Sequence, residues 1–540
     1  MKKFVVSVIA SVFALVLTYG AYAADAPSDT AVVAKGDTKI TIGGMIMFRG
    51  EYSRNRYNQI NDDAKLASRT ITTPFGATTP TTYYQIVTPD DHQAYYDGML
   101  NLNLGVKVSD SVEGYIELQS GNGNNTDMWM WGNMADSTYG GVMASGTGAT
   151  GVYQSGNSKV GTMYIRQAWI KYDKSLYGVK VGHQLLMLGN GLFFDHTKFG
   201  DDAIVVFVNP SKNFHIGAFT AKFREGTGGT GVNSQINTYN ANARIVSPYN
   251  SANGSARAND SDAYVLLAKY SGKNFNASGD ITVFNDQAIY ANTPVTNGPT
   301  FTDSMQLWNF GLRGDGQIGQ VTLRGDLELQ AGKYNNQQPG QSGGRFRGWA
   351  ALAGVDYKIG PAKLTGEFAY GSGKAGNDTG NDITQFVTTL GHTQHYTYVY
   401  EHRTRAASGV VGSGLSNTMY IKGGVSVDIT KSISAETYLY WLHAAKEVAL
   451  NDTGGRIGNV PYNPNYSRDL GWELDAKVTY KFAKNLKYWV EGGYFWTGSA
   501  YNYRTSQTTY SNASAPSTYN TYEYSRNNAY AIRHGICLHF

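Results

Sequence analysis

The amino-acid sequence predicts an all-β fold: a transmembrane antiparallel up-and-down β-barrel of about 18 strands. Three observations predict this class. Apolar and polar side chains alternate along many segments, the connections between these segments alternate between short and long, and the chain ends on an alternating strand closed by Phe540. These patterns are typical of barrels that cross the outer membrane of Gram-negative bacteria, with the apolar face toward lipid and the polar face toward the interior.

The first residues have the three parts of a secretory signal peptide. Lys2 and Lys3 precede an apolar run over 4–17, and Ala21-Tyr22-Ala23 supplies small residues for cleavage. The run is too short for a spanning helix, which needs about 20 residues. We therefore expect a signal peptide over 1–23 and a single barrel over 24–540. An N-terminal anchor helix is the alternative, and the well-placed cleavage site argues against it.

The composition is unusual for a soluble enzyme. The chain has 64 Gly and 40 Tyr, and only 16% of its residues are charged, against about 25% in soluble domains. Its 45 Lys and Arg nearly balance 41 Asp and Glu, so nucleic acid is not an expected partner. A single Cys excludes an intramolecular disulfide and any multi-cysteine metal site.

Period-two alternation identifies the strands. In 100–108, for example, Leu and Val alternate with Asn, Gly and Lys. Eighteen such segments run from 39–52 to 528–540, and the pattern is weakest in 202–209 and 262–270. A soluble β-sandwich shows the same alternation, so this pattern alone does not separate the two classes.

The connections separate them. Short turns such as 109–111 and 430–431 alternate with long polar segments such as 53–93, 121–160 and 371–416. Short periplasmic turns and long extracellular loops are characteristic of bacterial outer-membrane barrels. An even strand number then places both termini in the periplasm.

Aromatic residues and the last residue agree with a membrane barrel. Aromatic side chains prefer the membrane interface, although strands favour them in any case. Those near strand ends are Trp308, Trp349, Trp441, Trp472, Tyr480, Tyr488, Trp489 and Tyr494. The terminal Phe540 resembles the signal that the barrel assembly machinery reads, although His534 departs from the usual apolar residue.

The polar faces define the expected pore lining, provided that the register is right, because a slip of one residue turns a strand over. The expected pore-lining residues are Arg49, Lys107, Glu113, Glu117, Lys180, Gln184, Arg313, Arg324, Asp326, Glu328, Glu367, Lys422, Glu436, Glu473, Lys477, Glu491 and Arg533. Mixed charge either produces a transverse field in an aqueous pore or pairs across strands and holds the wall together. We expect most of these charges to be structural. Acids outnumber bases on the polar faces as a whole, which predicts a slight preference for cations.

A loop folded into the lumen would set the aperture. The segment 187–196 is rich in Gly and carries two Phe residues that solvent would not accommodate well. The expected constriction residues are Asn190, Phe193, Phe194, Asp195 and His196. Alternatively this loop packs on an outer neighbour, and segment 371–416 closes the mouth instead.

Other constellations have weaker support. His392, His395, Glu401 and His402 offer metal ligands but no regular spacing, and 377–382 offers alternating oxygen ligands without the distal Glu of an EF-hand. No Ser or His is spaced with an acid in a recognisable catalytic motif. We therefore predict no metal, no cofactor and no enzymatic activity.

One hairpin carries a family resemblance. Residues 163–172 (MYIRQAWIKY) and 179–184 (VKVGHQ) resemble the hairpin of alginate-export-type porins, with His183 in place of the usual arginine. The resemblance implies an 18-stranded barrel and carries the family's arginine over to Arg166, on a strand whose two faces both mix apolar and polar residues. The length, Tyr content and long loops also resemble the OmpJ-type outer-membrane channels of metal-reducing bacteria.

These observations predict an outer-membrane porin for passive diffusion of ions and small hydrophilic solutes. We do not expect it to export alginate, because a polyanion needs a lumen rich in Arg and Lys. The expected partners are outer-membrane lipids, the barrel assembly machinery and small hydrophilic solutes. A second copy of the chain and outer-membrane cytochromes stay open as partners. The alternative function is a structural or partner-dependent barrel that supports extracellular electron transfer.

Overall fold

The structure is a computed structural model. It describes residues 31–35, 38–55, 69–71, 81–83, 92–121, 129–130, 162–224, 261–290, 302–335, 343–375, 378, 380–390, 396–401, 414–448, 467–501, 503–512, 515–524 and 527–540. The expected signal peptide therefore lies outside the described residues. Among the described residues, no helix has the length and apolar character needed to cross a membrane.

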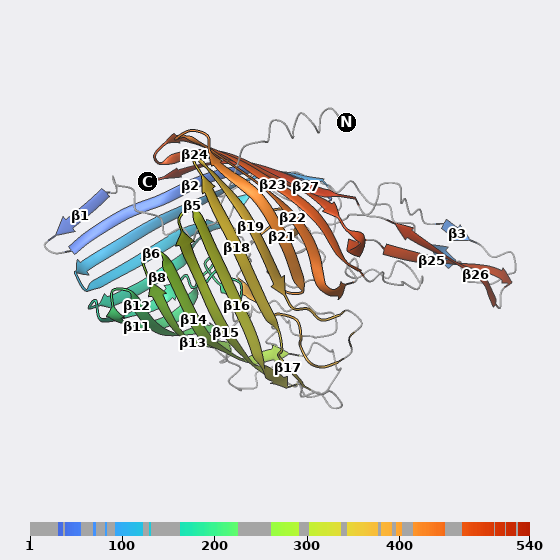
Figure 1. Ribbon diagram of the computed structural model, residues 1–540, viewed down its shortest axis with the longest axis horizontal. Coiled ribbons are helices and arrows are strands. Elements are labelled where there is room, and N and C mark those ends of the chain that lie inside the picture. Colours follow the sequence, from blue (N-terminus) through green and yellow to red (C-terminus); the bar gives the residue numbers. More distant parts are fainter. Residues whose placement is uncertain are drawn as a thin grey trace, which may run out of the picture.

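Eighteen antiparallel strands close into one barrel (Figure 1). They are β2 (Thr38–Arg54), β5 (His92–Ser109), β6 (Val112–Gly121), β8 (Thr162–Asp173), β9 (Tyr177–Gln184), β11 (Asp201–Ser211), β12 (Phe214–Arg224), β13 (Ser261–Ser271), β14 (Phe275–Tyr290), β15 (Thr302–Ile318), β16 (Val321–Asn335), β18 (Trp349–Ile359), β19 (Ala362–Gly371), β21 (Thr418–Asp428), β22 (Ile433–Val448), β23 (Ser467–Ala483), β24 (Leu486–Thr497) and β27 (Ala529–His539). Each strand pairs with its neighbours in chain order, and β27 pairs with both β24 and β2. The predicted fold class and strand number are confirmed, including the two weakest segments, which form β11 and β13.

The alternation separates two faces. Large apolar side chains are exposed on the outside, such as Leu312 at 63% and Ile532 at 50%, whereas their neighbours Arg313 and Arg533 are 6% and 7% exposed. Successive side chains of a strand point to opposite faces, so the apolar face forms an outer belt and the charged face lies inside. One predicted interfacial residue is misplaced: Trp489 is 7% exposed and lies beneath Lys477, because its position on β24 has the inward parity.

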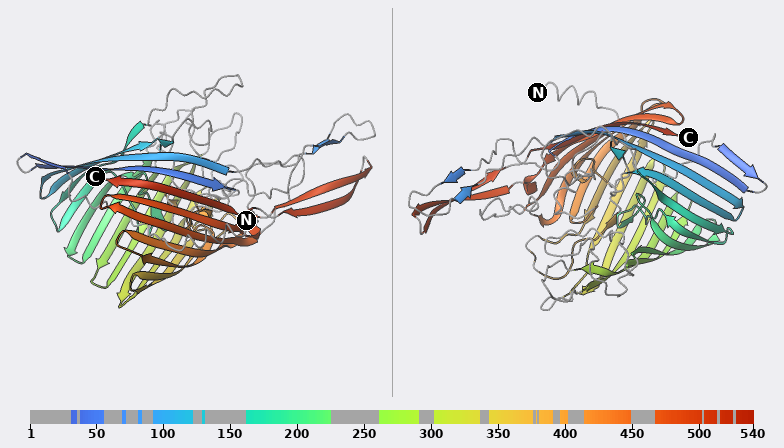
Figure 2. Two further views of the ribbon diagram at one scale, coloured as in Figure 1. Left: turned by 90° about the horizontal axis from the view of Figure 1, so that it is seen from above. Right: turned by 180° about the vertical axis from the view of Figure 1, so that it is seen from behind.

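The two ends of the barrel differ. The short turns gather at one end, where β1 (Ala31–Lys35) pairs with the first residues of β2. At the other end the hairpin of β25 (Tyr503–Asn512) and β26 (Ala515–Tyr524) projects beyond the wall (Figure 2). Short additional strands are β3 (Arg69–Ile71), β4 (Thr81–Tyr83), β7 (Trp129–Met130), β10 (Phe194–Asp195), β17 (Gly344–Arg345) and β20 (Thr389–Leu390), with one 3-10 turn, η3 (Ser499–Tyr501).

The last residue closes the barrel. Gly44 donates its N–H to the Phe540 carbonyl at 2.8 Å, and Phe540 returns the bond to the Gly44 carbonyl at 3.0 Å. A Cβ at Gly44 would lie 2.6 Å from the Phe540 ring. Glycine is therefore required at this position of β2 so that the terminal ring can pack on the strand.

Candidate channel interior

A β-bulge shapes the inner face of β8. The pairing of β6 with β8 shifts register between Glu117 and Leu118, so that Arg166 is the extra residue. Both Arg166 and Gln167 then reach Glu117: Arg166 Nη1 lies 2.7 Å from Oε1, and Gln167 Nε2 donates to Oε2 at 2.6 Å. The bulge explains why both parities of this strand mix apolar and polar residues, since the alternation changes phase within it.

Three carboxylates share one guanidinium on β14–β16. Arg313 is paired with Asp280 and Glu328, and its Nε lies 3.5 Å from Asp326 Oδ2. All four side chains are at most 6% exposed. Asn309 Nδ2 donates to Glu328 Oε2 at 2.6 Å. The acid excess expected in the lumen is therefore partly buried in the wall.

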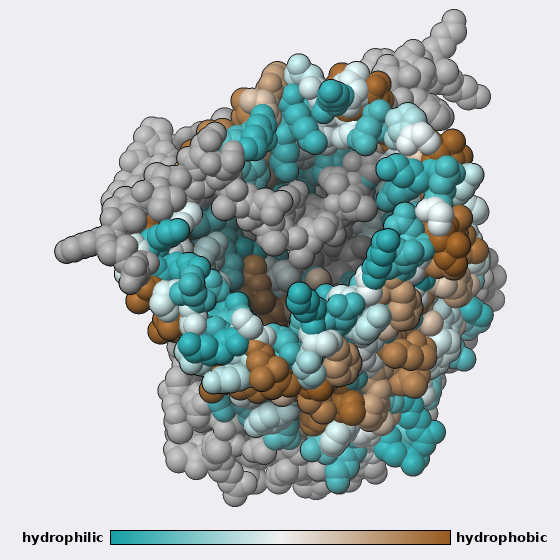
Figure 3. Space-filling model, turned by 60° about the vertical axis from the view of Figure 1, so that its left-hand side comes forward, coloured by the Kyte–Doolittle hydropathy of each residue, from teal (hydrophilic) through white to brown (hydrophobic). Residues whose placement is uncertain are grey.

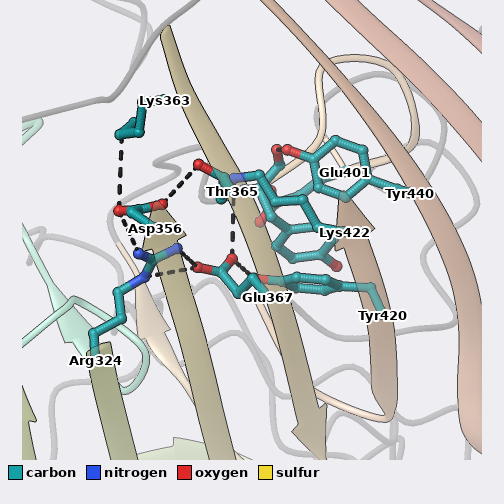
Figure 4. Close-up of polar contacts among 10 residues, drawn as sticks. Arg324, Asp356, Lys363, Thr365, Glu367, Glu401, Tyr420, Lys422 and Tyr440 are labelled. Carbon is teal, nitrogen blue, oxygen red and sulfur yellow. Dashed lines mark hydrogen bonds and ion pairs between the residues drawn. The ribbon is translucent and has the colours of Figure 1, made fainter. Parts of the chain in front are cut away.

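A second cluster surrounds Arg324 (Figure 4). Its Nη1 lies 2.8 Å from Asp356 Oδ2, and its Nη2 lies 2.6 Å from Glu367 Oε2. The Tyr420 hydroxyl donates to Glu367 Oε1 at 2.8 Å. A Cβ at Gly354, directly across from Arg324, would lie 2.6 Å from the guanidinium, so a glycine there makes room for the cluster. Asp356 contacts the arginine from the adjacent strand β18 and Glu367 from β19, the next strand beyond it, so the cluster joins β16, β18 and β19.

From this cluster a belt of alternating charge continues around the barrel. It consists of Glu367, Lys422, Glu436, Lys477, Glu491, Arg533 and Glu51, on β19, β21, β22, β23, β24, β27 and β2 in that order. Five of the six steps join residues directly opposite each other on adjacent strands. Lys477 Nζ lies 2.8 Å from Glu491 Oε2, and Arg533 Nη2 lies 2.8 Å from Glu51 Oε2. We call these seven residues the charge belt.

The short inner loop, residues 185–200, lies against the inner wall. Phe193 and Phe194 are fully buried. Phe193 packs edge-on against Phe284 of β14 with centroids 5.7 Å apart, and Phe194 packs against Phe219 of β12 at 6.1 Å. Asn190 Nδ2 donates to Asp326 Oδ2 at 3.0 Å, on β16. The expected constriction residues therefore contact the inside of the barrel rather than an outer neighbour.

A second segment reaches the same place. The long inner loop consists of the described residues 372–375, 378, 380–390, 396–401 and 414–417, between β19 and β21. Its β20 pairs in parallel with β10 of the short inner loop. His196 lies between Asp201 and Thr389, with Nδ1 2.7 Å from Asp201 Oδ2 and Nε2 2.7 Å from Thr389 Oγ1. These three side chains are 2%, 7% and 1% exposed. The strand pairing and this hydrogen bond thus join the two inner loops to each other inside the barrel.

Hydrogen bonds also join the long inner loop to the inner wall. They reach β16 on one side of the flanking strands β19 and β21, and β23 on the other side. Gln330 of β16 donates Nε2 to the Val387 carbonyl at 2.7 Å and accepts the Val387 N–H at 2.9 Å. On the other side, Glu473 of β23 accepts the N–H groups of Val399 and Tyr400 at 2.5 and 2.7 Å. Side chains thereby satisfy backbone groups that a buried loop would otherwise leave unpaired.

The remaining expected pore-lining residues also lie on the inner face, and each contacts a side chain or a backbone group of the wall. Lys107 pairs with Asp110, and Glu113 pairs with Lys171. Lys180 Nζ lies 4.1 Å over the Trp169 ring. Gln184 donates to the Ala203 carbonyl. Arg49 forms a two-point contact with Asp97, with distances of 2.9 and 2.7 Å.

Several residues of the interior have no sequence signal of their own. Gln330 and Thr389 acquire their roles only because segments distant in sequence meet them. Arg166 is a different case, since its mixed-parity strand was a visible sign of a bulge. The pairing of Arg49 with Asp97 follows once β2 and β5 are placed in register, because the two residues lie directly opposite each other.

The two candidate metal sites of the sequence differ in what the structure describes of them. His392, His395 and His402 lie outside the described residues. In the calcium candidate, Asp382 Oδ1 accepts the Arg345 N–H at 3.0 Å and Oδ2 lies 3.1 Å from Arg347 Nε. That backbone hydrogen bond, followed by the charges of Arg347 and Arg345, lowers the pKa of Asp382. Its carboxylate is engaged by protein donors, and no group of three potential ligands is arranged for a metal among the described residues.

Comparisons with known proteins identify a family. The family model for alginate export matches residues 135–514, which is more than half of the chain. No curated protein matches. Similar solved structures include OccK5 (OpdH) of Pseudomonas aeruginosa, at 10% identity, 92% of this chain, 98% of that chain and TM-score 0.46. OpdQ of the same species has 11% sequence identity, with 92% of this chain and 97% of that chain covered and a TM-score of 0.46. OmpT of Vibrio cholerae has 9% sequence identity, with 94% of this chain and 100% of that chain covered and a TM-score of 0.34. At these values the likeness to solved structures carries no argument about function.

Proposed function

Because the chain belongs to the alginate-export family of outer-membrane barrels, we propose that it is a passive, water-filled channel for ions and small hydrophilic solutes. One observation carries this proposal: 18 strands close into a single barrel whose inner face is charged and polar. Barrels of 16–18 strands leave an aqueous passage, whereas barrels of about eight are filled by their own side chains. The family role in transport across the outer membrane agrees with it.

Alginate is not the proposed solute. A polyanion needs a track of basic groups, and the arginines of this interior are shared among acids. Arg313 contacts three carboxylates, Arg324 contacts two, and Arg533 contacts Glu51 and Glu491. We propose instead small solutes with a slight preference for cations, because acids outnumber bases in the middle of the wall.

The inner loops narrow this passage. The short inner loop lies on the inner face of β12–β16, and the long inner loop contacts β16 and β23. We therefore expect a conductance below that of an unobstructed barrel of this size. The same packing favours the second candidate, a partner-dependent or structural barrel, in which the loops close the lumen. The OmpJ-type resemblance and its link to extracellular electron transfer belong to that candidate.

Single-channel recording in a planar bilayer tests the proposal. We expect long-lived conductance steps from the refolded full-length mature chain, and a reversal potential in a salt gradient that favours cations. An anion-favouring reversal potential would leave the channel in place and overturn the proposed selectivity. If a barrel shown to be folded by its circular dichroism and heat-modifiable electrophoretic mobility gives no conductance, the closed-lumen candidate replaces the channel.

A further inference from the structure

The end of the barrel that carries the short turns is strongly basic. Its segments are 38–41, 106–113, 170–180, 207–215, 268–276, 314–322, 356–363, 427–434 and 480–487. These segments contain 14 Lys and no Arg, against six Asp and Glu. The whole chain has 45 basic and 41 acidic residues, so the rest of the chain holds 31 against 35. The excess of positive charge is therefore confined to one end, which in outer-membrane barrels faces the periplasm.

Many of these lysines face the interior. Lys107 adjoins Val108, Lys269 adjoins Tyr270, Lys358 lies between Tyr357 and Ile359, and Lys481 lies between Tyr480 and Phe482. Each of these apolar neighbours belongs to the outer belt, and their exposed fractions range from 38% to 56%. Because side chains alternate along a strand, the lysines belong to the inner face.

The mouth at this end is rimmed by hydrophilic residues. Figure 3 views the molecule from the side of the short turns, and hydrophilic residues surround a hollow there, with hydrophobic residues outside it. Lysines that served to bind lipid headgroups would be expected on the outer face instead. The inward parity indicates that this charge acts on what passes through the mouth.

The middle of the wall has a different balance. In the charge belt four carboxylates alternate with three cations, and the Arg313 cluster adds three carboxylates to one guanidinium. A positive zone at the periplasmic mouth is thus followed by a zone with an excess of acids. Fixed charges of opposite sign in series make a pore conduct unequally in its two directions, because each zone concentrates its own counter-ions.

We propose that the channel rectifies, and that the lysines of the periplasmic mouth are responsible. This proposal rests on the proposed open channel. Current is larger when the extracellular side is positive, because anions held at the mouth and cations held in the acidic zone then both move toward the boundary between the zones and enrich it. With the opposite polarity both leave that boundary and deplete it.

The test is the current–voltage curve of single channels in symmetric dilute salt. The orientation of each channel is determined with an Asn213→Cys variant, because Asn213 lies in an exposed short turn. A bulky thiol reagent is added to one chamber and reacts only with channels whose short turns face that chamber. The native Cys537 is only 2% exposed and is protected from the reagent. We expect at least about 1.5-fold more current with the extracellular side positive at 0.05 M salt, and a nearly symmetric curve at 1 M, where the screening length is only about 3 Å.

Matched variants identify the lysines. Replacing Lys107, Lys269, Lys358 and Lys481 with Gln should abolish most of the asymmetry. Replacing Lys333 and Lys446, which are exposed near the opposite end, should leave it unchanged or increase it. A symmetric or reversed curve in dilute salt from the unsubstituted channel overturns rectification and leaves the channel intact. Absence of conductance from a folded barrel overturns the proposed function itself. If the quadruple variant does not fold, the salt dependence of the unsubstituted channel tests the proposal, and an asymmetry that persists at 1 M salt overturns it.

Discussion

Arg533 on β27 lies directly opposite Glu491 on β24 and directly opposite Glu51 on β2, and it contacts both carboxylates at the junction where the last strand meets the first. The guanidinium also lies 5.5 Å from the Tyr398 ring of the long inner loop. One side chain thereby links the last strand pairings of the barrel to the loop inside it.

Replacing Arg533 with Met should destabilise the barrel by about 3–5 kcal/mol, because two buried carboxylates lose a cation, although Glu491 keeps its contact with Lys477. Glu51 and Glu491 are 6% and 8% exposed and would lose their shared cation. The measurement is the free energy of unfolding in urea from lipid vesicles. A variant that also carries Glu51→Gln and Glu491→Gln should recover part of the loss. Equal stability of the single variant and the unsubstituted protein would contradict this role.

Replacing Gly189 with Val should displace the short inner loop and increase conductance. Gly189 has φ +56°, and a Cβ there would lie 1.8 Å from Arg313 Nε, so the loop cannot stay against β15. Single-channel conductance should rise, with more noise. Gly319→Val is the matched control, since Gly319 also has a positive φ, +61°, but meets nothing within 4 Å. An equal rise in both variants would attribute the effect to backbone strain alone.

The strands could be predicted from the sequence because a membrane barrel repeats one local rule. Lipid outside and water or charge inside impose period two on every strand, so Leu323 and Arg324 differ in exposure for the same reason as Ile532 and Arg533. Where the rule is interrupted, as at Arg166, the sequence shows mixed parity without locating the extra residue. The bulge is fixed by pairing with Glu117 on another strand.

The inner loops could be predicted only in part. Glycines and two Phe residues in 187–196 indicate a segment that avoids solvent, but they do not name its neighbours. The partners Gln330 and Thr389 are ordinary polar residues in the sequence, and only the folded arrangement brings them to the loops. The number and sign of charges were visible, whereas their pairing required the register of neighbouring strands.

Replacing Glu473 with Gln should loosen the long inner loop without unfolding the barrel. The carboxylate accepts two backbone N–H groups, whereas an amide offers one oxygen and places its NH₂ group against the other donor. The local cost is about 1–3 kcal/mol for an unsatisfied buried group. Hydrogen exchange at Val399 and Tyr400 should accelerate. Asp428→Asn, at an exposed strand end, is the control, and unchanged exchange in the Glu473 variant would refute the anchoring role.

Replacing Gly44 with Val should impair barrel closure. The side chain would collide with the Phe540 ring at 2.6 Å and with the Asn101 carbonyl at 2.5 Å, where reciprocal backbone hydrogen bonds join the first and last strands. Refolding into lipid vesicles should give a lower yield of the heat-modifiable form. Gly423→Val is the matched control, because Gly423 also lies within a barrel strand and a Cβ there meets nothing within 4 Å. If Gly44→Val with Phe540→Ala refolds better than Gly44→Val alone, the collision with the ring is the cause. If removing the ring gives no recovery, the Asn101 contact of the neighbouring strand is responsible, and Phe540 contributes to closure through its backbone alone.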